Sequence, residues 1–300
     1  MRSISPPELP LLELPEPYDL ELSTARYRAF GTDLANLWHD GGLHRVVDGR
    51  EVRITESAGG VAVDPLDARI EPVVRKLLGA EFDVDDFYAF AATEPTLAEL
   101  AADLRGLRPP LAVEPFESIV TSITAQQVSL HAAFAIRNRL IERFGVRVEH
   151  AYAFPTRERL ALAEPDEIAA IGFSRRKAEY VINLARSDLD LAGLALLPDD
   201  EVKAALTALP GIGEWTADWF LARHLARPRA WPAGDLGLRK AVTRFYGEGR
   251  DLTTDEVRAI GERFEPFQNL TAHYLLTGMR RVRSCVAERP STGRAEHQPA

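Results

Sequence analysis

The chain has 300 residues, of which 46% are hydrophobic, and a formal net charge of −9 at pH 7. Coating nucleic acid by bulk electrostatics requires many Lys and Arg to neutralise phosphates, so this acidic balance excludes that mode of binding. Cys285 is the only cysteine, which excludes an intramolecular disulfide and a zinc or iron–sulfur site built on four cysteines.

No segment has the apolar run of a secretory signal, or the roughly 18 apolar residues of a membrane-spanning helix. We therefore expect a cytoplasmic protein with no membrane partner. The seven histidines are scattered along the chain without metal-ligand spacing, so the sequence indicates no transition-metal site.

The first ninety residues show strand patterns. Apolar and polar residues alternate over 18–22, which is typical of a strand. Asp48-Gly49 separates two alternating segments and predicts a β-hairpin, and a further strand is expected at 61–63. A helix is predicted over 69–78. We expect a small α+β domain with an antiparallel sheet over residues 11–90.

From residue 91 the pattern becomes helical, with Gly or Pro marking the turns. Ser129 is a typical N-cap for a helix that ends at Gly145. We expect an essentially all-helical domain over 91–285 and a disordered tail over 286–300. Further helices are predicted at 157–163, 166–171, 177–185, 199–208, 214–225 and 236–245.

The strongest local signal is Leu209-Pro210-Gly211-Ile212-Gly213, which lies between two predicted helices. Gly211 and Gly213 can adopt backbone angles forbidden to other residues, so that successive N–H groups can point at one acceptor. Ile212 is expected to anchor the turn in the core. The helix that begins at Glu214 adds its N-terminal N–H groups and positive dipole end. Together they predict a phosphate site made of backbone; the alternative is a plain helix connection.

With this hairpin followed by a carboxylate at Asp235, the sequence resembles the helix-hairpin-helix (HhH-GPD) DNA glycosylase superfamily, and within it the DNA-3-methyladenine glycosylase II (AlkA-like) group. Ala125-Gln126-Gln127-Val128-Ser129 and the segment 231–240 also match, and the likeness covers about residues 115–283. It implies a mainly α fold in which two helical subdomains flank a cleft. It also implies a monofunctional enzyme that flips alkylated purines out of duplex DNA and hydrolyses their N-glycosidic bond, leaving an abasic site for base excision repair.

Asp235 matches the catalytic carboxylate of that family. Asp is also a favoured N-cap, and the helix predicted to follow needs one, so the two roles are compatible. Cleavage of an N-glycosidic bond builds positive charge on the sugar, which a nearby anion stabilises. Direct stabilisation of the sugar and orientation of the attacking water both remain open for Asp235.

Trp215 stands where members of the family that also nick the strand carry a Lys able to form a Schiff base. Its presence predicts hydrolysis without lyase activity. Two other functions stay open: a non-catalytic DNA-binding protein that uses the hairpin as a phosphate clamp, and a bifunctional glycosylase for oxidised bases.

The resemblance assigns Trp215, Trp219 and Leu236 to the base pocket. The two tryptophans are spaced i, i+4, so that both can face one cleft and attract a cationic base; the alternative is a pair of core tryptophans. Leu236 replaces an aromatic residue, and 270–276 lacks an expected Trp, which implies a wider or less aromatic pocket. Gln127 falls at the position of the wedge that fills the gap left by the flipped base; a polar surface residue is the alternative.

The resemblance further implies a Na⁺ or K⁺ ion held by the backbone carbonyls of Thr207, Leu209 and Ile212, next to a DNA phosphate. No cofactor is expected for the chemistry itself. The expected partner is damaged double-stranded DNA, with nucleoid association when bound. We expect a monomer, since no protein partner is evident in the sequence.

Overall fold

The computed structural model describes residues 9–287, so that the predicted tail over 286–300 lies almost entirely outside the described residues. An antiparallel five-stranded sheet has the order β1-β5-β4-β3-β2. The hairpin predicted at Asp48-Gly49 is confirmed, because it joins β3 to β4, and β5 contains the strand predicted at 61–63. The strands are β1 (Leu11–Glu13), β2 (Leu37–His39), β3 (Gly42–Val47), β4 (Arg50–Ser57) and β5 (Gly60–Asp64).

The strand predicted over 18–22 is wrong, because this segment forms the short helix α1 (Leu20–Thr24). The Asp19 carboxylate accepts the N–H of Leu22 at 2.7 Å and so starts the helix. Leu20 and Leu22 are both buried. Over so few residues, alternation fits a strand or one buried side of a helical turn equally well. The predicted helix over 69–78 is confirmed as α2 (Ile70–Leu77).

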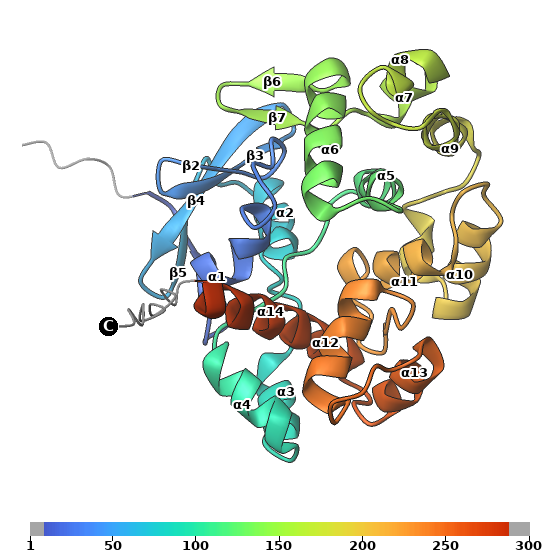
Figure 1. Cartoon of the computed structure of the whole chain (residues 1–300). Coiled ribbons are helices and arrows are strands. Elements are labelled where there is room, and N and C mark those ends of the chain that lie inside the picture. The colour runs from blue at the N-terminus through green and yellow to red at the C-terminus, as the bar shows by residue number, and fades with distance from the viewer. Residues whose placement is uncertain (1–8, 288–300) are drawn as a thin grey trace, which may run out of the picture.

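The remaining chain is dominated by helices, as predicted. Figure 1 shows the sheet on one side, α7 to α11 on the other, and α5 and α6 between them. Ser129 caps α6 through its hydroxyl, which accepts the N–H of Ala132 at 3.2 Å, as predicted. The helices are η1 (Ala25–Tyr27), α3 (Val84–Ala91), α4 (Pro95–Asp103), α5 (Pro115–Ala125), α6 (Leu130–Phe144), α7 (Arg157–Ala161), α8 (Pro165–Ala169), α9 (Arg175–Arg186), η2 (Gly193–Leu196), α10 (Asp199–Thr207), α11 (Glu214–Arg223), α12 (Leu236–Tyr246), α13 (Thr254–Glu262) and α14 (Gln268–Ala287).

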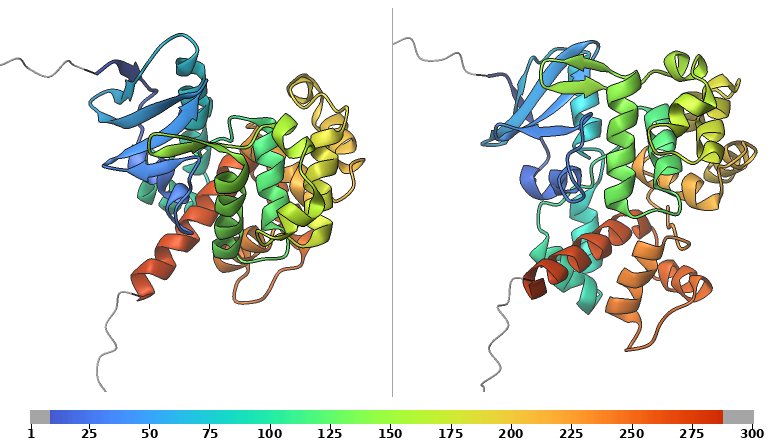
Figure 2. Two further views of the ribbon diagram at one scale, coloured as in Figure 1. Left: turned by 90° about the horizontal axis from the view of Figure 1, so that it is seen from above. Right: turned by 45° about the horizontal axis from the view of Figure 1, so that its top comes forward.

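One part of the helical region departs from the prediction, since β6 (Val146–Val148) and β7 (Ala151–Ala153) form a second antiparallel hairpin. It lies beside the five-stranded sheet (Figure 2). The Glu51 carboxylate of β4 accepts the backbone N–H of Ala151 at 2.8 Å. Three-residue strands carry little local signal, so contacts with the sheet decide this conformation. The domain boundary predicted at residue 90 falls within α3 and stays a prediction.

The hydrophobic core has three clusters. The largest is formed by residues of the helices from α4 to α14 and contains Trp219 and Phe220. A second fills the space between the sheet and α2, and a third packs α3 and α4 against α14. Within residues 9–287, no helix combines the length and the apolar character needed to span a membrane.

A buried ionic network connects the sheet to α5 and α6. Glu117 of α5 accepts hydrogen bonds from Arg45 of β3 at 2.7 Å and from Arg137 of α6 at 2.6 Å. Arg137 also donates to Asp33 at 2.5 Å. All four side chains are buried. Because buried charges require partners, removing one member leaves the others uncompensated.

We predict that Glu117→Ala lowers the free energy of unfolding by about 3–5 kcal/mol, because two buried guanidinium groups lose their shared anion. Chemical denaturation measures this change. Glu114→Ala is the matched control: Glu114 is exposed at the start of the same helix and makes no side-chain capping bond there, so its change should stay within about 0.5 kcal/mol. Equal effects of the two variants would contradict the role of the network.

The network also predicts a pH dependence. Burial alone would raise the pKa of the Glu117 carboxyl, but the charges of Arg45 and Arg137 outweigh burial and hold that pKa below its ordinary value of 4.5. The contribution of Glu117 to stability is therefore complete above this value and is lost as the pH falls through the lower, folded-state pKa. The stability gap between the wild type and Glu117→Ala should narrow below about pH 4.5.

Candidate functional site

Asp235 lies at the start of α12, and its carboxylate accepts three N–H groups. Oδ1 accepts the backbone N–H of Leu238 at 2.8 Å, so Asp235 is the N-cap of this helix. Oδ2 accepts the indole N–H of Trp215 at 2.8 Å and that of Trp219 at 3.0 Å. The side chain is partly exposed. These bonds fix the carboxylate in one orientation while leaving it accessible.

The two tryptophans occupy successive turns of α11 and converge on Asp235. Trp219 is only 2% exposed, and the Arg223 guanidinium covers its ring at 3.3 Å from the centroid. Arg223, one turn further along α11, thus occupies one face of the Trp219 ring, and the assignment of Trp215 and Trp219 to a base pocket stays a prediction. Trp215 is partly exposed, and Leu236, in the first turn of α12, is 54% exposed.

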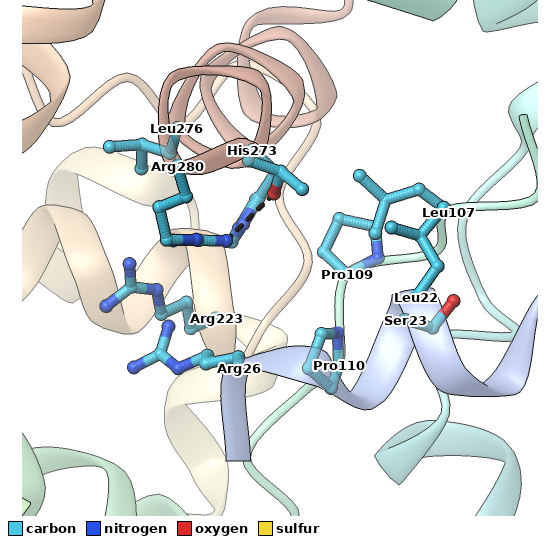
Figure 3. Close-up of a pocket in the computed structure, with 11 residues that line it drawn as sticks. Leu22, Ser23, Arg26, Leu107, Pro109, Pro110, Arg223, His273, Leu276 and Arg280 are labelled. Atoms are coloured by element: carbon cyan, nitrogen blue, oxygen red, sulfur yellow. Dashed lines mark hydrogen bonds between the residues drawn. The ribbon is translucent and has the colours of Figure 1, made fainter. Parts of the chain in front are cut away.

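A small pocket lined by arginines from three elements is connected to this carboxylate through Trp219, whose ring Arg223 covers. Arg26 comes from η1, Arg223 from α11 and Arg280 from α14. Figure 3 shows Arg26 and Arg223 extending in the same direction, with Arg280 and His273 on the neighbouring helix. No motif in the sequence pointed to these residues. The spacing of Trp215, Trp219 and Arg223 at i, i+4 and i+8 is the one local signal that could have included Arg223.

The electrostatics of this pocket are dominated by burial. Burial lowers the pKa of Arg223 well below its usual range, and the charge of Asp235 acts in the opposite direction. Burial, together with the nearby arginines, also lowers the pKa of His273, which is thus neutral at pH 7. Arg223 Nε and His273 Nε2 are buried nitrogens without a hydrogen-bond partner. The Arg223 Nε–H favours a ligand that can accept a hydrogen bond, and His273 Nε2 can donate or accept according to its tautomer.

The hairpin between α10 and α11 has the predicted form, with one correction. Ile212 is 4% exposed and anchors the turn in the core, as expected. Gly211 has a φ of +84°, and a Cβ there would lie 2.1 Å from the Tyr180 ring. Gly213 has a φ of −102°, which any residue adopts, so the expectation that both glycines need unusual angles is wrong. A Cβ on Gly213 would meet nothing within 4 Å, so this glycine leaves open surface.

The hairpin has backbone N–H groups that an anion could accept and backbone carbonyls that a cation could contact. No side chain caps α11, so its first-turn N–H groups have no side-chain acceptor. The predicted cation ligands Thr207, Leu209 and Ile212 lie in this same turn, and the Leu209 carbonyl accepts the Ile212 N–H at 3.2 Å. A carbonyl oxygen has a second lone pair, so this donor set fits a monovalent cation.

The loop between α5 and α6 is joined to the hairpin by Gln126, a residue to which the sequence analysis gave no role. The Gln126 side-chain amide donates to the Gly211 carbonyl at 2.9 Å. Lys177 of α9 donates to the carbonyl of Thr124 at 3.0 Å and so fixes the base of the loop. Gln127, the predicted wedge, is exposed with a φ of +55°. The structure therefore separates the two glutamines into an anchor and an outward-facing side chain.

The chain is similar to known proteins in both sequence and structure. The model of the HhH-GPD superfamily, described as base excision DNA repair proteins, matches residues 120–266. DNA-3-methyladenine glycosylase 2 of Escherichia coli (strain K12) is 32% identical over 213 residues, which cover 68% of this chain and 72% of the relative.

Two solved structures are also similar. That of 3-methyladenine DNA glycosylase from Archaeoglobus fulgidus has a TM-score of 0.81 and 29% identity, and covers 90% of this chain and 98% of the other. That of the Schizosaccharomyces pombe enzyme Mag1 in complex with abasic DNA has a TM-score of 0.56 and 26% identity, and covers 63% and 94%.

Replacing the two hairpin glycines by alanine should affect stability differently. Gly211→Ala should lower the free energy of unfolding by about 1–3 kcal/mol, because the new Cβ overlaps the Tyr180 ring and the backbone has a positive φ. Gly213→Ala is the matched control and should leave stability within about 0.5 kcal/mol. Thermal and chemical denaturation measure both, and a larger loss at Gly213 would contradict the described turn.

Proposed function

Because the chain belongs to the HhH-GPD superfamily of base excision DNA repair proteins, we propose that it is a monofunctional DNA glycosylase which hydrolyses the N-glycosidic bond of alkylated purines in duplex DNA. The observation that carries this proposal is the placement of Asp235, a partly exposed carboxylate that two indole N–H groups hold in one orientation. The names of the relatives point to the same substrate class.

In the proposed reaction, Asp235 acts as a fixed anion. As the bond to the base lengthens, positive charge develops on the sugar, and a carboxylate held in place stabilises that charge without reorganising. Trp215 and Trp219 act through Asp235 as positioning residues, since each donates to the same oxygen. The same carboxylate can also orient the water that attacks the sugar.

Trp215 supports hydrolysis without strand cleavage. By the family resemblance, a lysine at this position would form the Schiff base. The indole Nε1 of Trp215 lies 2.8 Å from Oδ2 of Asp235. An indole has no nucleophilic amine. The product of this chemistry is an abasic site in an intact strand.

For the contact with DNA, we assign a phosphate to the backbone N–H groups of Gly211, Gly213 and Glu214, at the uncapped start of α11. A Na⁺ or K⁺ ion held by the opposite carbonyls of the hairpin would supply positive charge toward the same phosphate. Gln127, exposed at the tip of its loop, is the proposed wedge. The protein acts on damaged double-stranded DNA as a monomer in the cytoplasm.

Asp235→Asn should slow the release of methylated purines from methylated duplex DNA by at least about 100-fold, because the amide cannot offset the charge on the sugar. Binding of DNA that contains an abasic-site analogue should change only a few-fold. Asp188→Asn, an exposed carboxylate in a loop, is the matched control and should react at the wild-type rate.

Chromatography of the released bases measures this reaction, and the DNA is examined in parallel for breaks before and after alkali. If the wild type releases no base, the proposed function fails. If Asp235→Asn remains active, the role of the carboxylate fails. Breaks that form without alkali would indicate a lyase.

The arginine pocket should influence which damaged bases react fastest. A cationic base is repelled by guanidinium groups, whereas a neutral base with a carbonyl oxygen can accept their hydrogen bonds. Arg26→Ala should therefore raise the kcat/KM ratio of 3-methyladenine to neutral hypoxanthine on the order of tenfold. Arg28→Ala is the control, because Arg28 stacks on Trp38 and does not line the pocket. An unchanged ratio in both variants would contradict this role of the pocket.

A further inference from the structure

The structure brings His150 next to His44 and Glu51, which lie about 100 residues earlier in the chain. His44 lies on β3, Glu51 on β4, and His150 in the turn between β6 and β7. One possible ligand atom from each lies within 4.8 Å of the other two. The His39 ring stacks on that of His150, with 4.7 Å between centroids. The cluster belongs to the sheet and the β6–β7 hairpin, away from α12 and Asp235 (Figure 1).

Glu51 is oriented by contacts on both of its oxygens. Oε2 accepts the backbone N–H groups of His150 at 2.7 Å and Ala151 at 2.8 Å. Oε1 lies 2.6 Å from Nδ1 of His44 and 3.0 Å from Nδ1 of His150. Burial alone would raise the pKa of the Glu51 carboxyl, but the Ala151 N–H and the His44 ring hold it below its usual range. The carboxylate therefore presents one fixed oxygen to two imidazoles.

His44 has an acceptor at each ring nitrogen. Its Nε2 lies 3.1 Å from the His39 carbonyl oxygen, and its Nδ1 faces Glu51. A carbonyl oxygen can only accept, so Nε2 carries the hydrogen. In many metal sites the second ring nitrogen of a ligating histidine donates to a carbonyl in this way. Nδ1 of His44 and Oε1 of Glu51 therefore face each other as two possible ligand atoms, and a bound cation would take the place of the proton that they share.

We propose that His44, Glu51 and His150 bind a divalent transition metal ion of the zinc class. Two imidazoles and one carboxylate, with a fourth position left for water or another ligand, form a common donor set for such an ion. Ligand atoms around tetrahedral zinc lie roughly 3.3 Å apart. Binding would therefore widen the 2.6 Å separation of His44 and Glu51 and the 3.0 Å separation of His150 and Glu51, and the exposed His150 side chain can move to complete the site. His150 has 52% of its side chain exposed and gives both access and freedom to adjust, whereas His44 and Glu51 are 5% exposed.

The ion would act as a clip between two parts of the fold. His44 and Glu51 belong to neighbouring strands of the sheet, while His150 follows about 100 residues later on the β6–β7 hairpin. Binding that requires all three would stabilise the folded state over the unfolded chain, in which no such site exists. The site is separate from the proposed glycosylase chemistry and does not depend on it.

The test uses the untagged full-length protein after treatment with a chelator. Calorimetric titration with Zn²⁺ should give one equivalent bound with a Kd on the order of micromolar or tighter, and zinc should raise the melting temperature. Co²⁺ bound at the same site should give the visible absorption bands of a tetrahedral or five-coordinate centre. Absence of stoichiometric binding overturns the proposal and leaves a hydrogen-bonded cluster.

The variants locate the ion. His150→Ala removes an exposed ligand and should weaken zinc binding at least tenfold, with circular dichroism confirming the fold. Glu51→Gln should also weaken binding and should change the cobalt spectrum. His131→Ala, an exposed histidine on α6 outside the cluster, is the matched control and should bind as the wild type does. Unchanged binding in His150→Ala overturns the proposal.

Discussion

The ion network around Glu117 is the constraint on which the arrangement of the helices and sheet depends. A carboxylate in a protein interior is stable only with compensating charge, and here that charge comes from Arg45 of the sheet and Arg137 of α6. The requirement is directional, because each guanidinium donates to a different oxygen of Glu117. The network therefore sets the position of α5 relative to the sheet. Since α5 ends in the loop with Gln126, it also sets the place of that loop beside the hairpin.

Asp235 combines a structural role with the chemical role that we propose for it. One oxygen satisfies the first turn of α12, and the other accepts two indole N–H groups from α11. The orientation of the carboxylate is thus determined by two helices packed in the largest core cluster. Arg223 covers the buried Trp219 ring and brings positive charge near the same carboxylate. Helix α11 therefore connects the carboxylate of Asp235 to the arginine pocket.

Contact with DNA and a net charge of −9 are compatible because the proposed phosphate site consists of backbone. The open surface at Gly213 and the uncapped start of α11 leave N–H groups available without adding any basic side chain. The His44, Glu51 and His150 cluster follows a different principle, because its donors are side chains from one β-hairpin and from a turn about 100 residues later. Local backbone geometry thus accounts for one proposed site, and tertiary packing for the other.

The sequence by itself determined the features whose signal is contiguous: the hairpin at 209–213, the β-turn at Asp48-Gly49, the Ser129 cap and the placement of Asp235 before a helix. Each depends on backbone preferences of neighbouring residues. Tertiary structure alone decided the β6–β7 hairpin, the arginine pocket and the histidine cluster. Their partners are separated by tens to about 100 residues, as Glu51 and His150 are, and such contacts leave no periodicity to detect. The covered face of Trp219 belongs to the same class, because i, i+4 spacing predicts a shared side of a helix but not what packs against it.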